Sequence, residues 1–133
     1  MSRYLLDTNV ISAAIRDPGG SVDQALRRYR NEEIGTSLIV HGEILFGLKR
    51  KPSIRGKERL EALLETLEVW PLESPADEVY GDIRASLEKQ GQSMGPNDMW
   101  IAAQAIALDA TLVTDDRAFS RLSQLKIENW VRV

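Results

Sequence analysis

Short apolar segments alternate with longer segments of helical periodicity along this chain of 133 residues. The apolar segments have the length and composition of buried strands, and apolar residues recur between them at the spacing of amphipathic helices. The predicted strands are residues 4–6, 34–37, 68–72, 111–114 and 127–131. The predicted helices are residues 10–15, 22–30, 38–50, 56–67, 75–90, 98–108 and 117–122.

One or two predicted helices separate each strand from the next, and this constrains the topology of the sheet. Parallel strands need such crossover connections, whereas antiparallel neighbours can be joined by short hairpins. We therefore expect a three-layer α/β/α fold of the α/β class, with a mainly parallel central sheet. A chain of this length is typical of one domain, so residues 1–133 are expected to form a single domain.

Polar residues predict where three of the helices begin. Ser21 and Asn97 each precede a helical segment and are expected to cap it, because Ser and Asn side chains accept hydrogen bonds from the first helical amides. Ser74 is expected to cap a third helix, with Pro75 at the first helical position.

The composition excludes several kinds of chemistry. The chain has no Cys and a single His, His41, which excludes disulfides, thiol nucleophiles and His-rich zinc sites. It has 20 Asp and Glu against 17 Lys and Arg, so its chemistry must rest mainly on carboxylates. Because no apolar run approaches roughly 18 residues and no secretory pattern opens the chain, we expect a cytoplasmic protein without a membrane segment.

Four acidic residues stand apart from the acids on solvated helix faces: two follow strands and two lie on inward helix faces. Asp7 ends an apolar strand, and Asp116 follows another strand, with Asp115 before it. Glu43 and Asp98 fall on helix faces that are otherwise made of apolar and small residues. Ligands bind at the carboxyl ends of the strands in open parallel sheets, so we expect these acids to meet at one edge of the sheet.

Each acid also has a purely structural interpretation. Asp7 or Asp116 suits the cap of a helix, and Asp98 favours the positive end of a helix dipole. Glu43 has basic residues in the last turn of its own helix with which it can pair. The joint placement of the four acids is what favours a common site.

Four convergent carboxylates need a positive charge among them. Without one, each pair repels by about 4 kcal/mol at a separation of ~4 Å and an effective dielectric constant of ~20. An all-oxygen donor set suits Mg²⁺ or Mn²⁺ rather than zinc, and these ions keep waters and bind phosphate oxygens. The pattern therefore indicates metal-assisted attack of water on a phosphodiester.

Four short motifs, each with one of these acids, carry a resemblance to a known family. They are LLDTNV at residues 5–10, GEILFG at 42–47, GPNDMWIAA at 95–103 and LVTDD at 112–116. In their order and spacing they resemble the PIN-domain ribonucleases, and within them the VapC toxins of bacterial toxin–antitoxin pairs. The resemblance spans essentially the whole chain.

The resemblance implies an endoribonuclease that depends on Mg²⁺ or Mn²⁺, with one or two ions. The catalytic, metal-binding acids that it implies are Asp7, Glu43, Asp98 and Asp116. Thr8 and Asn9 match residues that support the first acid, and Thr114 matches one that orients the fourth. Asp115 is a further supporting residue, because the family pattern of Thr, any residue and then an acid favours Asp116 as the ligand.

The resemblance also implies partners: an RNA substrate, a cognate VapB-like antitoxin that inhibits the toxin, and a homodimer that joins the antitoxin in a hetero-oligomer. Residues 83–96 look similar to toxins that cut initiator tRNA in its anticodon loop. The alternatives are a non-catalytic RNA- or protein-binding PIN module, and a phosphatase with Asp7 as its nucleophile. The phosphatase pattern requires a second Asp two positions on, where this chain has Asn9.

A basic segment predicts which side of the protein faces RNA. Between residues 27 and 59 the chain has nine Lys and Arg and four Glu, although its net charge is -3. Phosphate neutralisation dominates nucleic-acid affinity, so we expect RNA contacts from Lys49, Lys51 and Arg55. A solvated helix face is the alternative interpretation.

Overall fold

A five-stranded sheet forms the centre of the protein in the computed structural model, which describes residues 2–132. The strands are β1 (Arg3–Leu6), β2 (Glu33–Ser37), β3 (Glu68–Trp70), β4 (Ala110–Val113) and β5 (Ile127–Glu128). Their order is β3-β2-β1-β4-β5, and all neighbouring pairs are parallel. The predicted α/β class and parallel sheet are thus confirmed. Residues 1 and 133, the ends of the predicted domain, lie outside the described residues.

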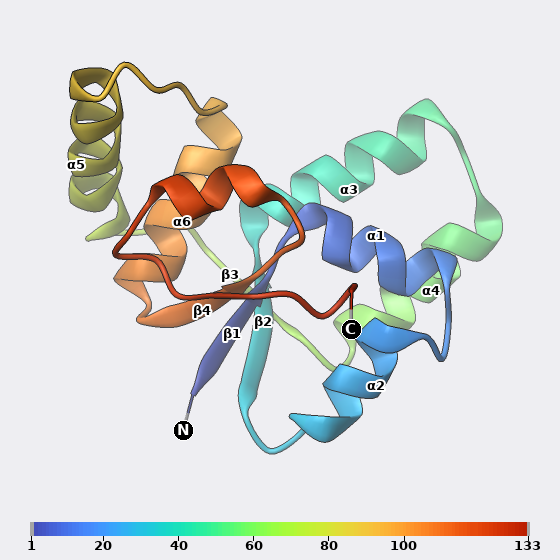
Figure 1. Cartoon of the computed structure of the whole chain (residues 1–133). Coiled ribbons are helices and arrows are strands. Elements are labelled where there is room, and N and C mark those ends of the chain that lie inside the picture. Colours follow the sequence, from blue (N-terminus) through green and yellow to red (C-terminus); the bar gives the residue numbers. More distant parts are fainter. Residues whose placement is uncertain (1, 133) are drawn as a thin grey trace.

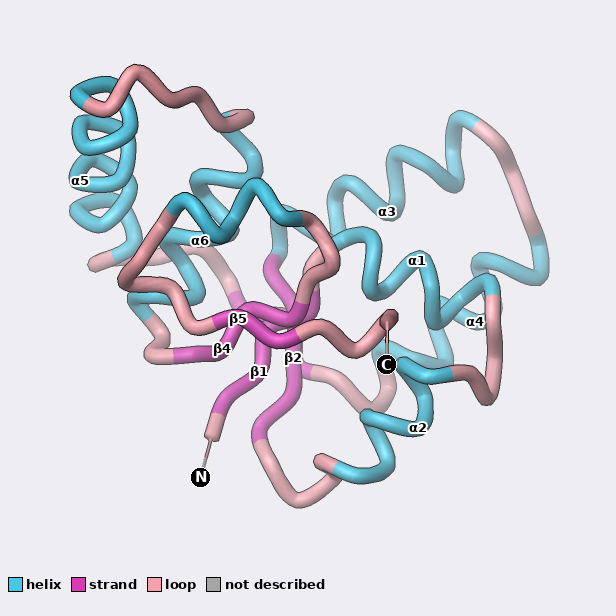
Figure 2. The backbone as a smooth tube through the Cα atoms, in the orientation of Figure 1, coloured by secondary structure: helices cyan, strands magenta, loops and turns pink. Residues whose placement is uncertain are grey.

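Helices cover both faces of this sheet. They are α1 (Thr8–Arg16), α2 (Ser21–Arg28), α3 (Leu38–Arg50), α4 (Ile54–Leu64), α5 (Ala76–Lys89), α6 (Pro96–Ala107) and the 3-10 helix η1 (Arg117–Arg121). Figure 1 shows α1 to α4 on one side of the strands and α5 and α6 on the other. Figure 2 shows the strands as a narrow magenta layer between the two groups of helices, which is the predicted three-layer arrangement.

The chain reverses its direction of travel across the sheet at β1. From β1 it passes through α1 and α2 to β2 and on to β3, and then returns through α5 and α6 to β4 on the other side of β1. In open α/β sheets, a crevice forms outside the carboxyl ends of the strands at such a reversal. The ends of β1 and β4 therefore mark the place where a ligand site is expected.

The core holds the ends of β1 and β4 rigidly. Leu5 and Leu6 of β1 and Leu112 and Val113 of β4 are completely buried between the two helix layers. Leu6 is paired with Val113 in the ladder, and the next amide, that of Asp7, donates to the Val113 carbonyl at 2.9 Å. Leu6 and Val113, the last residues of β1 and β4, are thus fixed by packing and by backbone hydrogen bonds.

The predicted cap at Ser21 is wrong. Ser21 is the first residue of α2, and Gly20 takes the capping position with an extended backbone. The Ser21 hydroxyl instead donates to the Val131 carbonyl at 3.1 Å, since the C-terminal segment passes beside α2. A tertiary contact therefore replaces the local hydrogen bond on which the prediction rested.

The predicted starts of α5 and α6 are also wrong by one or two residues. Pro75 is the capping residue of α5 rather than its first residue, and the Ser74 hydroxyl donates to the Asp77 carboxylate at 2.8 Å. In α6, Pro96 occupies the first position, so Asn97 lies inside the helix and caps nothing. Proline is favoured at that first position because its fixed φ already fits the helix.

Smaller differences concern the ends of other elements. The helix predicted at residues 56–67 runs from Ile54 to Leu64, because the Ser53 hydroxyl caps it by accepting from the Gly56 amide at 2.9 Å. The terminal strand predicted at residues 127–131 ends at Glu128, where its pairing with β4 stops. Within residues 2–132, no helix has both the length and the apolar character needed to span a membrane.

Candidate active site

The four acids predicted to meet do line one cavity, of about 320 Å³, at the carboxyl ends of β1 and β4. Asp7 follows β1, Glu43 lies on α3, Asp98 lies in the first turn of α6, and Asp116 precedes η1. The complete lining consists of Asp7, Thr8, Asn9, Ser12, Arg16, Glu43, Asp98 and Asp116. The fold therefore brings together side chains that are separated by up to about a hundred residues, as its parallel topology requires.

Asp7 is the most deeply placed of these acids, with 4% of its surface exposed. It caps α1: its Oδ1 accepts from the Thr8 amide at 2.8 Å. Its Oδ2 accepts from the Thr114 hydroxyl, also at 2.8 Å, so the carboxylate is held between α1 and the end of β4. The capping interpretation of Asp7 is therefore correct as local structure, and the same carboxylate also lines the cavity.

The surroundings disfavour negative charge on two of the acids. Burial raises the pKa of Asp7 to about 6, and the carboxylates of Asp98 and Glu43 add to the rise, although the hydrogen bonds from Thr114 and Thr8 oppose it. Burial also raises the pKa of Asp98, with further contributions from Asp116 and Glu43. A cation in the cavity would relieve both effects.

Glu43 connects three helices at the rim of the cavity. The Thr8 hydroxyl of α1 donates to its Oε1 at 2.6 Å, and Asn97 of α6 donates through Nδ2 to its Oε2 at 3.4 Å. Within residues 2–132, neither Lys49 nor Arg50 lies within 4.0 Å of a carboxylate oxygen. The salt bridge that sequence reasoning offered as an alternative for Glu43 is therefore not formed.

Thr114 determines which of the two adjacent acids faces the cavity. Its Oγ1 donates to Asp7 and accepts from the Asp116 amide at 3.1 Å, and Asp116 in turn caps η1 through the Ala118 amide at 2.9 Å. Asp115 turns elsewhere: its Oδ1 accepts from Asn9 Nδ2, and its Oδ2 lies 4.0 Å from an Arg132 nitrogen. Asp116 lines the cavity and Asp115 supports its rim.

The donor set fits a hard divalent cation. All of the candidate ligands are carboxylate oxygens, and within residues 2–132 no Lys, Arg or His nitrogen lies within 4.0 Å of a carboxylate of the four acids. The side chains of these described residues are spread too widely for three to hold one ion directly. Mg²⁺ usually keeps several waters and needs only one or two carboxylates, so this spread is compatible with it.

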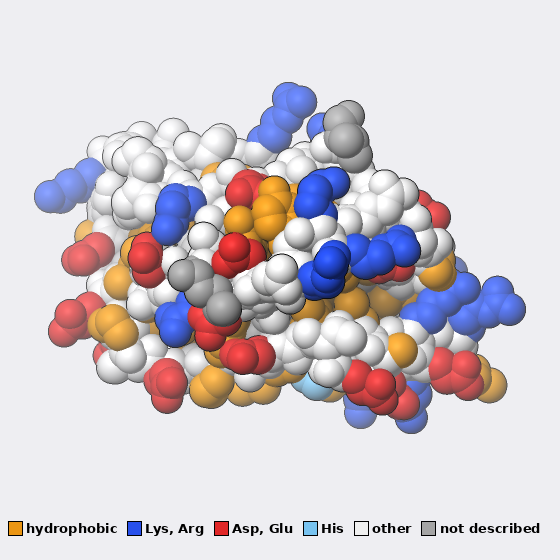
Figure 3. Space-filling model, turned by 90° about the horizontal axis from the view of Figure 1, so that it is seen from below, with side chains coloured by type: hydrophobic (Ala, Val, Ile, Leu, Met, Phe, Trp, Pro, Cys, Tyr) orange, Lys and Arg blue, Asp and Glu red, His pale blue; other side chains and the backbone are white. Residues whose placement is uncertain are grey.

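The basic residues predicted to contact RNA are not among the residues that line the cavity. Lys49 and Lys51 are exposed at the end of α3, and Arg55 is exposed in the first turn of α4. Figure 3 shows Lys and Arg side chains gathered on the right of the face seen from below, the side on which Figure 1 places α2 and α4. An RNA contact from these residues would therefore lie outside the cavity that holds the four acids.

Sequence reasoning missed three residues beside the acids. Ser12 and Arg16 of α1 line the cavity, and the Asn97 amide reaches Glu43. One signal was present for Ser12 and Arg16: they follow Thr8 at spacings of four and eight, which is the same face of a helix. Asn97 was predicted only as a helix cap, because its position in α6 depends on where Pro96 starts the helix.

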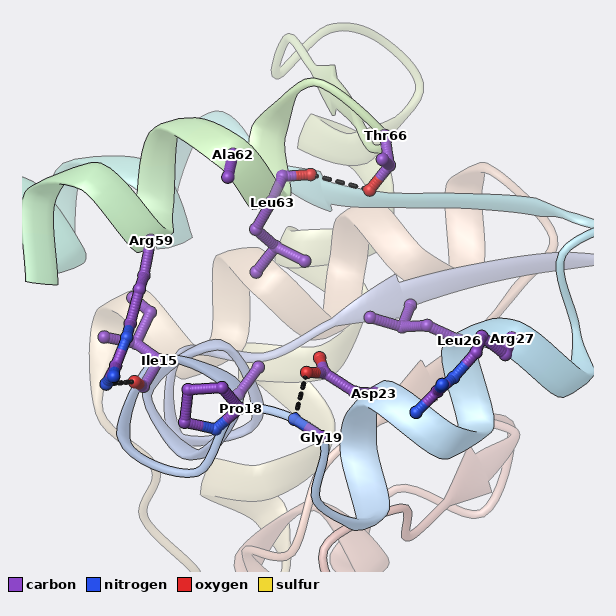
Figure 4. Close-up of a pocket in the computed structure, with 11 residues that line it drawn as sticks. Ile15, Pro18, Gly19, Asp23, Leu26, Arg27, Arg59, Ala62, Leu63 and Thr66 are labelled. Atoms are coloured by element: carbon purple, nitrogen blue, oxygen red, sulfur yellow. Dashed lines mark hydrogen bonds between the residues drawn. The ribbon is translucent and has the colours of Figure 1, made fainter.

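A second cavity, of about 500 Å³, lies between α1, α2 and α4 (Figure 4). Leu26 and Leu63 point into it, and its one carboxylate, Asp23, accepts from the Gly19 amide at 2.6 Å. Arg59 crosses its edge and donates to the Ile15 carbonyl at 2.8 Å. Because this cavity has no cluster of acids, the candidate active site is the smaller one.

Known proteins resemble this chain along nearly its entire length. The family model of the PIN domain matches residues 4–125. The chain is 35% identical over 130 residues to Ribonuclease VapC2 of Rickettsia felis, and the alignment covers 96% of this chain and 97% of that protein. It is 28% identical over 132 residues to the tRNA(fMet)-specific endonuclease VapC of Shigella flexneri, covering 98% of this chain and 99% of that protein.

Solved structures show the same arrangement of elements. The VapBC2 complex of Rickettsia felis bound to a DNA fragment from its promoter contains a chain that superposes with a TM-score of 0.90 and 34% identity, covering 96% of this chain and 98% of that one. A chain of VapBC-1 from nontypeable Haemophilus influenzae superposes with a TM-score of 0.85 and 28% identity, covering 98% and 99%.

The raised pKa of Asp7 predicts how the stability of the metal-free protein depends on pH. The unfolded chain loses the Asp7 proton near pH 3.8, whereas the folded chain keeps it up to about pH 6. Stability should therefore fall as pH rises through this window, by roughly 3 kcal/mol if Asp7 acts alone. Urea unfolding in EDTA at a series of pH values measures this, with Asp7→Asn as the comparison because Asn also caps helices. An equally steep fall in Asp7→Asn would show that Asp7 is not the cause.

Proposed function

This chain belongs to the PIN-domain family and, within it, to the VapC ribonucleases, and from this premise we propose that it is a Mg²⁺- or Mn²⁺-dependent endoribonuclease toxin. The observation that carries the proposal is the single cavity lined by four carboxylates with no basic partner within 4.0 Å in residues 2–132. An uncompensated acidic cavity costs stability, and cation binding is the function that explains it.

Asp7, Glu43, Asp98 and Asp116 are the proposed metal-binding and catalytic residues. A divalent ion bound there would supply an activated water and stabilise the leaving oxygen of the phosphodiester. Thr8 and Thr114 fix the direction of the Asp7 carboxylate, and Thr114 also holds the backbone of Asp116. The Asn9–Asp115 hydrogen bond joins α1 to the loop after β4, so these two residues keep both walls of the cavity in register.

RNA is the proposed substrate, and tRNA is the first class to test. Two relatives, from Shigella flexneri and Salmonella typhimurium, are named tRNA(fMet)-specific endonucleases and are 28% and 27% identical to this chain. Their similarity supports initiator tRNA as the first substrate. The likeness of residues 83–96 to toxins that cut its anticodon loop makes that loop the first cleavage site to test. Sequencing the new RNA ends after expression identifies the cleaved molecule directly.

A cognate VapB-like antitoxin is the proposed inhibitor, and we propose a homodimer that joins it in a hetero-oligomer. The similar chains from Rickettsia felis and Haemophilus influenzae were solved as VapBC complexes. In this chain, Phe46 of α3 and Ile54 of α4 expose 62% and 82% of their surfaces. A partner that covers these two side chains would remove apolar surface from water, which favours this side of the molecule for the antitoxin.

A non-catalytic PIN module that binds RNA or protein is the alternative. It predicts that the acids are only structural. Removing one would then leave RNA cleavage unchanged and bring no gain in stability. The proposed enzyme predicts the opposite on both counts.

Asp98→Asn should abolish RNA cleavage and raise the stability of the metal-free protein. The loss of cleavage should exceed the roughly hundredfold cost of losing an outer residue of a metal site. The gain in stability at pH 7.5 follows because burial and the carboxylates of Asp116 and Glu43 disfavour the Asp98 charge. Cleavage of a mixed RNA pool with Mg²⁺, Mn²⁺ or EDTA measures the first effect, and urea unfolding in EDTA measures the second.

A matched control for that experiment is Asp82→Asn, which removes an exposed carboxylate from α5. It should change neither cleavage nor stability appreciably. Cleavage by Asp98→Asn at the wild-type rate, or wild-type activity that persists in EDTA, contradicts the metal-dependent nuclease.

Replacing Lys49, Lys51 and Arg55 together with Gln should weaken RNA binding and its dependence on salt. If each neutralises one phosphate of single-stranded RNA, the slope of log affinity against log salt should fall in magnitude by about 2. Binding is measured in the Asp98→Asn background so that the RNA stays intact. Replacing Arg3 and Lys126 removes two charges at the amino ends of the strands, and an equal fall in slope per charge removed argues against the predicted contacts.

A further inference from the structure

We propose that Arg16, assisted by Ser12, binds a phosphate of the RNA next to the one at the metal site. The inference rests on the proposed ribonuclease function and adds a substrate-binding residue to it. Neither residue belongs to the four acids or to the side chains that support them, and both lie on α1 in the lining of the same cavity.

The first helix forms a polar track that leads away from the acids. Thr8, Ser12 and Arg16 are four residues apart and all line the cavity, so they share one face of α1. With a rise of about 1.5 Å per residue, Ser12 lies about 6 Å and Arg16 about 12 Å along the helix from Thr8. An RNA strand that leaves the acids along α1 would bring its next phosphates to Ser12 and Arg16.

The charges of the cavity give Arg16 a specific role. Arg16 is the basic residue among the eight that line it, opposite four carboxylates. A phosphate that is not itself at the metal is repelled by these acids, and a guanidinium nearby offsets that repulsion. Within residues 2–132, Arg16 pairs with no carboxylate at 4.0 Å or less, so its donors are not used in an internal ion pair.

Stabilising the end of α1 does not account for Arg16. A cation in the last turn favours the helix dipole, but that effect is small and screened by salt. Another residue also serves this end: Arg59 of α4 donates from Nη1 to the Ile15 carbonyl at 2.8 Å, as Figure 4 shows. The Asp17 amide closes the last turn on the Ala13 carbonyl at 2.9 Å.

The chemistry of the two side chains fits a phosphate. A guanidinium donates two parallel hydrogen bonds to phosphate oxygens, which an ammonium on a flexible stem cannot reproduce. The Ser12 hydroxyl, one turn nearer the acids, adds a neutral donor to the same group. Arg16→Lys should therefore restore only part of what Arg16→Gln removes.

The test compares Arg16→Gln, Arg16→Lys and Ser12→Ala with Lys126→Gln, which removes one exposed charge just before β5, at the amino ends of the strands. On a short single-stranded RNA, Arg16→Gln should raise KM about tenfold and change kcat less than twofold. In the Asp98→Asn background, it should reduce the slope of log affinity against log salt by about 0.7. Arg16→Lys should keep the slope but raise KM several-fold, and Ser12→Ala should raise KM about threefold.

RNA that carries a neutral methylphosphonate in place of one phosphate locates the contact. When the phosphate next to the cleaved bond is neutral, the wild-type protein should bind this RNA as weakly as Arg16→Gln binds ordinary RNA. The affinity of Arg16→Gln should be the same for both RNAs. If Arg16→Gln matches Lys126→Gln in KM and in salt slope, with unchanged melting temperatures, the inference is overturned while the nuclease stands. If wild type cleaves no RNA, the proposed function fails, and the salt slopes still decide whether Arg16 binds a phosphate.

Discussion

The hydrogen bond between the Thr114 hydroxyl and the Asp7 carboxylate is the interaction on which the site depends. It joins the ends of two neighbouring parallel strands, and Asp7 also caps the helix that follows β1. Thr114 accepts from the Asp116 amide, so one hydroxyl positions the first acid through its side chain and the fourth through its backbone. Because Leu6 and Val113 are fully buried just before these residues, neither strand end can shift without disturbing the core.

The fold holds these carboxylates close together although burial and mutual repulsion disfavour their negative charges. The Asp7 carboxylate is buried and its pKa is raised to about 6, so the metal-free fold loses stability by keeping it charged. The neutral hydroxyls and amides around it limit that loss but cannot cancel it, since a basic partner is lacking among residues 2–132. A positive residue in the same place would stabilise the protein and exclude a metal ion. Stability and cation binding thus make opposite demands on these residues.

The sequence predicted the topology and the acids for the same physical reason. Apolar strands followed by crossover helices form a parallel sheet. All of its strands end at the same edge, so acids at the ends of different strands lie near one another. The helix starts at Ser21, Ser74 and Asn97 were predicted less well, because a serine that finds a tertiary acceptor or a proline that begins a helix overrides the local cap. Arg16 escaped notice since a basic residue at a helix end has an ordinary explanation until its neighbours in space are known.

In an acidic protein that binds RNA, the phosphates are repelled at long range by the net charge and at short range by the acids of the site. At long range the basic residues between positions 27 and 59 oppose the net charge of -3, and none of them is among the residues that line the cavity. At short range these residues cannot replace a charge inside the cavity, because the field of an exposed charge is screened over about 10 Å at ordinary ionic strength. The four carboxylates then have to be offset locally, by a metal ion at the reacting phosphate and by a guanidinium beside it. Arg16 is the residue in the cavity that meets the second requirement, which is why its effect should be confined to substrate binding rather than to the chemical step.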